Sequence, residues 1–192
     1  MEQGYNTILI SGLPGVGKTT LVRKICDDLR VSYDCRGFIT EEVRSDQTLA
    51  RVGFDVVTLC DKRSILARER CANNERMAKL GKYSVYVNDF ERLVLPLLGH
   101  PNPKQDLLVI DEIGKMELKS KKFEIAVSEL IDKVPILATV PLQQRGNLKL
   151  VEYLKNSSKS RLFEISVNNR DDIKDEIVKC LKQRLGKPSI KI

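Results

Sequence analysis

The segment from Gly12 to Thr19 carries the strongest chemical signal in the sequence. It reads Gly-Leu-Pro-Gly-Val-Gly-Lys-Thr, matching G-x-x-x-x-G-K-[ST], with a β-branched run before it and a helical pattern after it. Because Gly12 and Gly17 lack side chains, successive backbone N–H groups can turn inward around phosphate oxygens. The segment therefore predicts a loop that binds the phosphates of a nucleotide.

Two side chains at the end of this loop have separate predicted roles. We expect the Lys18 ammonium to reach the β- and γ-phosphates and the Thr19 hydroxyl to contact Mg²⁺. The helix that follows turns the positive end of its dipole toward the same phosphates. The predicted nucleotide-binding residues of this segment are Gly12, Leu13, Pro14, Gly15, Val16, Gly17, Lys18, Thr19 and Thr20.

A pair of carboxylates follows a second apolar run, residues 107–110. We expect Asp111 and Glu112 to lie at the carboxyl end of a buried strand, where parallel sheets place their ligands. Asp111 is predicted to hold Mg²⁺ together with Thr19, and Glu112 to orient or deprotonate the water that attacks the γ-phosphate. Asp111, Glu112 and Lys18 are the candidate catalytic residues. The alternative is a purely structural role, in which such a pair caps the next helix.

Strands and helices alternate along most of the chain, which predicts an α/β fold with a mostly parallel sheet and helices on both faces. The expected strands are 7–11, 83–87, 107–110, 136–140 and 162–167. One expected helix starts at Thr19, and the other expected helices cover 90–98, 121–131, 148–154 and 171–185.

Two stretches interrupt this alternation. Residues 37–43 and 51–59 alternate apolar and polar side chains around a polar turn, which predicts an antiparallel β-hairpin inserted at 36–59. Residues 61–82 are basic and lack clean periodicity, so we expect a possible lid, although a partner surface or a solubilising segment fits equally. We expect one domain over 1–187 and a tail at 188–192.

Several motifs together resemble the cancer-related nucleoside-triphosphatase family. They are G-F-I-T-E-E-V-R at 37–44, R-V-G-F-D-V-V-T-L at 51–59, D-E-I-G-K-M-E-L at 111–118, A-T-V at 138–140 and N-R-D at 169–171. The resemblance covers nearly the whole chain, and D-E-I-G-K-M-E-L is its most specific part.

This resemblance implies a P-loop domain that slowly hydrolyses the γ-phosphate of ATP, GTP, CTP and UTP with Mg²⁺. It assigns Lys18, Thr19, Asp111 and Glu112 the roles argued above. It also implies a second phosphate contact at Lys115, against the alternative of a solvated loop lysine. The stretch that would follow the bound nucleotide is Val109, Ile110, Asp111, Glu112, Ile113, Gly114, Lys115 and Met116.

Two further groups leave alternatives open. Arg44 and Arg51 flank the hairpin turn, where either would stabilise transition-state charge or pair with nearby glutamates. We expect Asn169 and Arg170 to line the base pocket, with Arg170 stacked on the ring. The sequences D-x-x-G at 111–114 and N-R-D-D at 169–172 also approximate a guanine-nucleotide switch, and a nucleotide or small-molecule kinase is a third hypothesis.

Composition narrows the remaining choices. The 192 residues carry a formal charge of +7, which favours anionic ligands, but nucleic-acid binding would rest on charge alone and is not expected. Five scattered cysteines without a C-x-x-C pair argue against a disulfide framework and a zinc site, and no apolar run is long enough to span a membrane. We therefore expect a cytoplasmic monomer whose partners are nucleoside triphosphates, and the sequence leaves a protein partner unknown.

Overall fold

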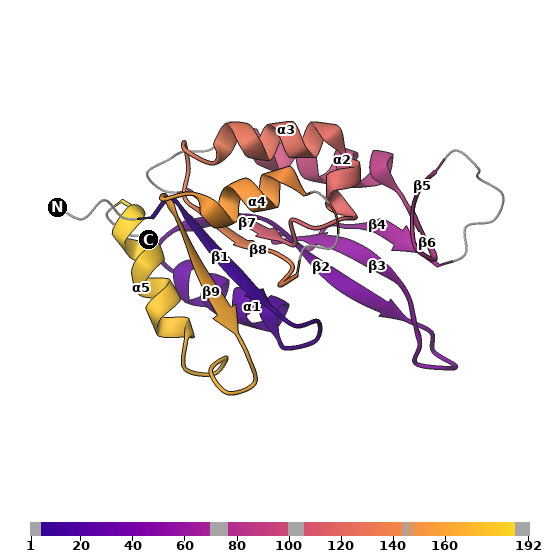
Figure 1. Ribbon diagram of the computed structural model, residues 1–192, viewed down its shortest axis with the longest axis horizontal. Helices are drawn as coiled ribbons and strands as arrows, with labels where there is room; N and C mark the ends of the chain where they lie inside the picture. The colour runs from indigo at the N-terminus through magenta and orange to yellow at the C-terminus, as the bar shows by residue number, and fades with distance from the viewer. Residues whose placement is uncertain (1–4, 70–76, 100–105, 144–145, 147, 187–192) are drawn as a thin grey trace.

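The computed structural model describes residues 5–69, 77–99, 106–143, 146 and 148–186. Over these residues the chain forms one sheet in the order β5-β6-β4-β3-β2-β7-β8-β1-β9 (Figure 1). The strands are β1 (Thr7–Gly12), β2 (Asp34–Arg44), β3 (Arg51–Thr58), β4 (Arg63–Arg68), β5 (Ala78–Leu80), β6 (Tyr83–Val85), β7 (Asp106–Asp111), β8 (Ile136–Thr139) and β9 (Ser160–Ile165).

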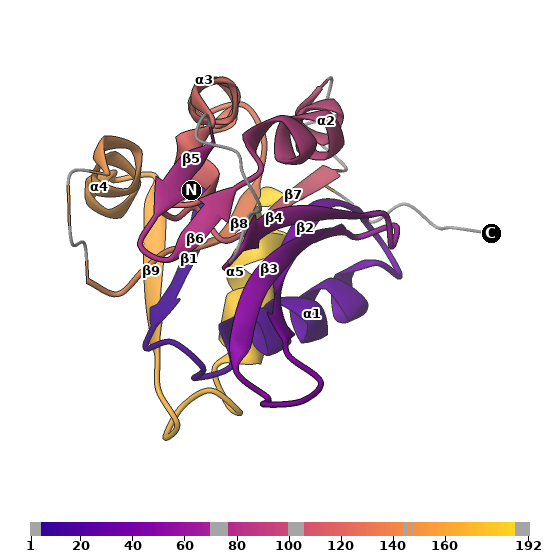
Figure 2. The same ribbon diagram turned by 90° about the vertical axis from the view of Figure 1, so that its right-hand side faces the viewer.

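Helices cover both faces of this sheet (Figures 1 and 2). Two of them pack on one face and three on the other, and each group has its own apolar core. The first group is α1 (Lys18–Leu29) and α5 (Lys174–Arg184), and the second is α2 (Val87–Leu98), α3 (Lys121–Leu130) and α4 (Lys149–Asn156). A short 3₁₀ helix, η1 (Glu117–Lys119), precedes α3.

The strands β2, β7, β8, β1 and β9 are parallel to one another. Every residue of β1 and of β7 is buried, because helices cover both faces of this half of the sheet. Leu9 faces one core while Ile8 and Ile10 face the other, as the two-residue period of a strand requires. The predicted α/β fold is confirmed.

The other half of the sheet is antiparallel and larger than the predicted hairpin. The first residues of β2 pair with β7, and the strand then runs past the end of β7 as one arm of the β2–β3 hairpin. β4 pairs with β3, and β6 pairs with both β4 and β5. The sequence interpretation missed β4 and β5 within 61–82; residues 70–76 of that segment and the predicted tail at 188–192 lie outside the described residues.

Some element boundaries differ from the sequence expectation. α2 begins at Val87 and contains Pro96 in its last turn. β9 covers Ser160–Ile165 and α5 starts only at Lys174. The connection between them is closed by the Asn169 side chain, whose Oδ1 accepts from Ser166 N at 2.8 Å and whose Nδ2 donates to the Glu164 carbonyl at 3.0 Å. Because this turn occupies the residues after β9, α5 begins later than the sequence predicts.

Three phenylalanines join the antiparallel half of the sheet to the helices above it. Phe38 on β2, Phe90 on α2 and Phe123 on α3 are fully buried and meet edge to face. Their ring centroids lie 5.2 to 5.9 Å apart. Buried aromatic groups in this geometry contribute both apolar area and quadrupole attraction.

We expect Phe90→Ala to lower the free energy of unfolding by about 3–5 kcal/mol, because it leaves a cavity between β2, α2 and α3. Urea unfolding measures the change. The control is Ile125→Ala on α3, a side chain 58% exposed, which should change stability by less than about 0.5 kcal/mol. Equal losses in the two variants would contradict this view of the core.

Candidate active site

The predicted phosphate loop joins the carboxyl end of β1 to the start of α1. Gly15 and Gly17 have φ angles of 76° and 108°, in the region that favours glycine, and Gly17 is the N-cap of α1. A Cβ atom on Gly12 would lie 2.6 Å from the Ile165 carbonyl oxygen of β9. These backbone requirements explain the glycines of the loop without reference to a ligand.

Lys18 folds back over this loop. Its Nζ donates to the carbonyl oxygens of Gly12 at 3.1 Å and Leu13 at 3.3 Å. The positive charge also lowers the pKa values of Asp111 and Glu112, opposing the effect of their burial. The ammonium is therefore bonded to the loop and close enough to act on both carboxylates, and its contact with phosphate stays a prediction.

Asp111 is the last residue of β7 and only 2% exposed. Its Oδ2 accepts from Thr19 Oγ1 at 2.6 Å, and its Oδ1 accepts from Thr139 Oγ1 of β8. Thr40 Oγ1 on β2 donates to the Asp111 backbone carbonyl at 2.6 Å. Burial raises the pKa of Asp111 and the Thr139, Thr19 and Lys18 contacts oppose that rise, so the net shift is upward.

The Thr19–Asp111 pair fits a Mg²⁺ ion. Both side chains present oxygen atoms, and Mg²⁺ in nucleotide sites is commonly held by one carboxylate, a hydroxyl and phosphate oxygens. Within the described ranges, no cluster of three or more His, Cys, Asp or Glu side chains forms a metal cage. The donor set therefore suits a cation that completes its coordination with phosphate and water.

Glu112 follows directly after β7 and is half-buried. Burial raises the pKa of its carboxyl most strongly; Lys18 lowers it and Asp111 raises it. A carboxylate with a raised pKa is a better proton acceptor than a fully solvated one. Glu112 thus lies beside Asp111 at the end of β7, and its role as the base stays a prediction.

Glu117 is a second buried carboxyl at this site, and sequence reasoning missed it. It is 4% exposed at the start of η1, and its Oε2 accepts from Gly114 N at 3.1 Å. Burial, followed by the nearby charge of Glu112, raises the pKa of Glu117 to about 8. The signal was available, because Glu117 stands between Met116 and Leu118 in the motif D-E-I-G-K-M-E-L.

The structure corrects part of the stretch predicted to follow the nucleotide. Val109 and Ile110 are completely buried inside β7, and Ile113 packs into the core beneath it, so these side chains are not available to a ligand. Lys115 is exposed, and its Nζ would lie 3.8 Å from a Cβ on Gly146. Helices on both faces of the sheet leave only the end of the strand open.

The arginines near the hairpin are held in ion pairs. Arg44 and Arg51 both pair with Glu42, and Arg44 also donates to the Leu49 carbonyl. Arg63 on β4 pairs with Glu41 and Asp55. Pairing with glutamates, one of the two alternatives for Arg44 and Arg51, is therefore the arrangement in the structure.

Arg170 borders the phosphate loop, whereas the Asn169 amide serves its own turn. Arg170 Nη1 donates to the Val16 carbonyl at 3.1 Å, and its Cδ would lie 3.8 Å from a Cβ on Gly17. The side chain of Arg170 is 41% exposed. Of the two predicted base-pocket residues, Arg170 is thus the one whose guanidinium lies beside the loop, where its Nε also lies 3.9 Å from Asp171 Oδ2.

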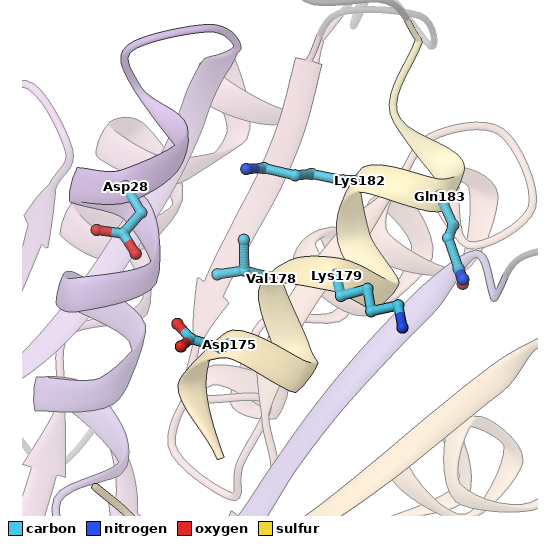
Figure 3. A pocket seen from close by; sticks show the side chains of 6 residues that line it. All are labelled: Asp28, Asp175, Val178, Lys179, Lys182 and Gln183. Carbon is cyan, nitrogen blue, oxygen red and sulfur yellow. The ribbon is translucent and has the colours of Figure 1, made fainter. Parts of the chain in front are cut away.

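A groove of about 550 Å³ between α1 and α5 lies at the other end of α1 from the loop (Figure 3). It carries carboxylates and ammonium groups together, and Lys174 beside it pairs with Asp28. Its lining residues are Asp28, Asp175, Val178, Lys179, Lys182 and Gln183. This groove contains none of the predicted site residues.

Helices within the described part of the chain are all too short or too polar to cross a membrane.

The chain is similar to known proteins over most of its length. A family model described as NTPase matches residues 7–178. The chain is 38% identical to the nucleoside-triphosphatase THEP1 of Thermotoga sp. (strain RQ2), covering 93% of this chain and 97% of the relative. It is 39% identical to the human cancer-related nucleoside-triphosphatase, with coverages of 91% and 96%.

Two solved structures share the fold. The crystal structure of THEP1 from Aquifex aeolicus aligns with a TM-score of 0.78 at 35% identity, over 92% of this chain and 99% of that one. The solution structure of a human cancer-related nucleoside triphosphatase aligns with a TM-score of 0.76 at 38% identity, over 92% and 97%. The resemblance seen in the sequence motifs is confirmed.

We expect the parent protein to lose stability relative to Glu117→Gln as the pH rises from about 4.5 to about 8. The folded state keeps a proton on Glu117 that the unfolded chain has already released, so higher pH favours unfolding. The difference should reach about 4–5 kcal/mol in urea unfolding with EDTA present. Glu129→Gln, at an exposed position of α3, is the control and should track the parent. Parallel curves for parent and Glu117→Gln would show that Glu117 is not held neutral.

Proposed function

The chain belongs to the NTPase family, whose relatives are named nucleoside-triphosphatases, and from this premise we propose that it hydrolyses nucleoside triphosphates to diphosphates and phosphate. The proposal extends to Mg²⁺ dependence, slow turnover and a broad choice of base. The observation that carries it is the contact of Thr19 with Asp111, which brings together the predicted phosphate loop, the carboxylate proposed to hold Mg²⁺ and the neighbouring Glu112. The contributions of the individual residues follow from this arrangement.

The loop and Lys18 bind the triphosphate through backbone N–H groups and one ammonium. Thr19 and Asp111 are the residues that would hold Mg²⁺, which neutralises charge on the β- and γ-phosphate oxygens when bound. Phosphoryl transfer needs positioning and charge neutralisation more than covalent participation of the protein. Lys18, Thr19 and Asp111 would therefore account for binding of the triphosphate and for much of the stabilisation of the transition state.

Glu112 accepts a proton from the attacking water. The water oxygen bonds to the γ-phosphorus, the bond from that phosphorus to the β–γ bridging oxygen breaks, and the diphosphate leaves. The proposal of slow turnover is supported by Arg44 and Arg51, because both pair with Glu42 and would have to leave it to stabilise the transition state. An arginine in that role contributes about 10³–10⁵ in rate in related chemistry.

Broad base preference is supported by the two residues proposed to line the base pocket. Both polar atoms of the Asn169 amide are bonded to the backbone of the turn, so the amide is poorly suited to read a base edge. The guanidinium of Arg170 is a planar cation that stacks on any base. This arrangement argues against a guanine-nucleotide switch, which must distinguish guanine from other bases.

We expect phosphate release from ATP, GTP, CTP and UTP with Mg²⁺ and almost none with EDTA. Glu112→Gln should lower kcat by about 10²–10⁴, because it removes the proton acceptor and keeps the shape of the side chain. Steady-state phosphate release measures both effects. Glu152→Gln, an exposed change on α4, is the matched control and should behave as the parent does.

Other outcomes of this experiment would identify the competing functions. Release confined to GTP and unchanged in Glu112→Gln would favour the switch. No release until a small-molecule or nucleotide acceptor is added would favour a kinase. A Lys18→Ala protein that hydrolyses ATP at the parent rate would exclude the proposed site altogether.

Arg170→Ala tests the base pocket. We expect KM for all four nucleotides to rise by a similar factor, up to about tenfold, because the lost stacking energy of about 0.5–1 kcal/mol or more does not depend on the base. The kcat values should stay within about threefold, since the phosphates and Glu112 are untouched. Lys149→Ala, at the start of α4, serves as the control for removing a positive charge. A loss restricted to one base would contradict stacking as the mode of recognition.

A further inference from the structure

The carboxyl groups of Glu112 and Glu117 converge on one small space. A Cβ atom on Gly114 would lie 2.8 Å from Glu112 Oε1 and 3.0 Å from Glu117 Oε2. The two oxygens therefore lie on the same side of Gly114, and a side chain at that position would collide with both. Gly114 leaves room here for the carboxyl pair, and a larger residue would displace one or both carboxyl groups.

Glu117 is held firmly within this pair. Its Oε2 accepts from Gly114 N, and the Gly114 carbonyl accepts from Leu118 N at 3.0 Å, which closes the turn between Glu112 and η1. Leu118 packs against the apolar core. Ser120, just after η1, caps α3 by accepting from Phe123 N at 3.0 Å. The backbone around Glu117 is thus bonded on both sides.

The charges around Glu117 are mostly of its own sign. Glu112 is the nearest, and Asp111 acts in the same direction from the end of β7. On α2, which packs beside η1, Glu91 is compensated by Lys122 and Ser120 of the next segment. With both flanking carboxylates ionised, Glu117 is most stable in its neutral form, and the pair then carries one negative charge.

We propose that Glu117 is a positioning residue that fixes the direction of the Glu112 carboxylate during hydrolysis. It does so by occupying the space beside Glu112 and by holding the Gly114 backbone that connects the two. This inference rests on the proposed function, in which Glu112 accepts the proton of the attacking water. Glu117 itself touches neither water nor phosphate in this role.

The test is steady-state phosphate release from ATP with Mg²⁺ between pH 6 and 9.5, for the parent, Glu117→Ala, Glu117→Gln and the control Glu129→Gln. Glu117→Ala should lower kcat at least tenfold and leave KM within about threefold, because the phosphate loop is intact. Glu117→Gln should recover most of kcat, since its amide keeps the shape of a neutral carboxyl and accepts from Gly114 N.

The pH profile separates positioning from mere packing. Parent kcat should fall as the pH passes the Glu117 pKa of about 8, because a second negative charge beside Glu112 pushes it out of place. Glu117→Gln cannot ionise, so its kcat should not fall in that range. A structural role alone would give the two proteins the same alkaline limb.

The results separate the positioning role of Glu117 from the proposed role of Glu112. If Glu117→Ala matches the parent, or if Glu117→Gln keeps the parent's alkaline limb, the positioning role is wrong. If Glu117→Ala does not fold, the profile of Glu117→Gln decides alone. If Glu112→Gln releases phosphate at the parent rate, the proposed role of Glu112 fails and this inference falls with it. If the parent itself releases no phosphate, the proposed function fails. An inactive Glu112→Gln beside unaffected Glu117 variants overturns only the inference.

Discussion

The hydrogen bond from Thr19 to Asp111 is the contact on which the site depends. It joins the first turn of α1 to the end of β7, although β8 lies between β7 and β1 in the sheet. Thr139 bonds the other oxygen of Asp111 from β8, so one carboxylate connects three elements. Because Asp111 is buried, each of these bonds offsets part of a desolvation cost that folding must otherwise meet.

Among the residues that the structure describes, the site concentrates negative charge around Lys18. Asp111, Glu112 and Glu117 lie close together, and Lys18 is the cation that acts on the first two. Such an arrangement is unfavourable for folding, since burial raises all three pKa values, and favourable for binding a divalent cation with phosphate. The fold tolerates it because β1 and β7, buried along their whole length, supply apolar contacts that do not depend on the site.

The sequence predicts the fold correctly where a local motif is typical of one structure only. A glycine loop followed by Lys18, and an apolar strand followed by Asp111, predict both the fold and the convergence of these residues. It failed where polar side chains are buried by pairing. Asp55 of β3 forms ion pairs with two arginines of β4, and this pairing makes part of the basic segment a strand of the sheet. Glu117 is buried although its side chain is ionisable. Such pairings depend on residues distant in the chain, which local patterns do not contain.

The turn closed by Asn169 has a consequence for how such an enzyme behaves in a mixture of nucleotides. Its amide is fully engaged within the chain, so discrimination among bases has no hydrogen-bonding reader at that position. Competing substrates with similar kcat/KM values are consumed in proportion to their concentrations. With the broad base preference proposed above, the enzyme would respond to the composition of the nucleotide pool, and the most abundant triphosphate would account for most of its flux.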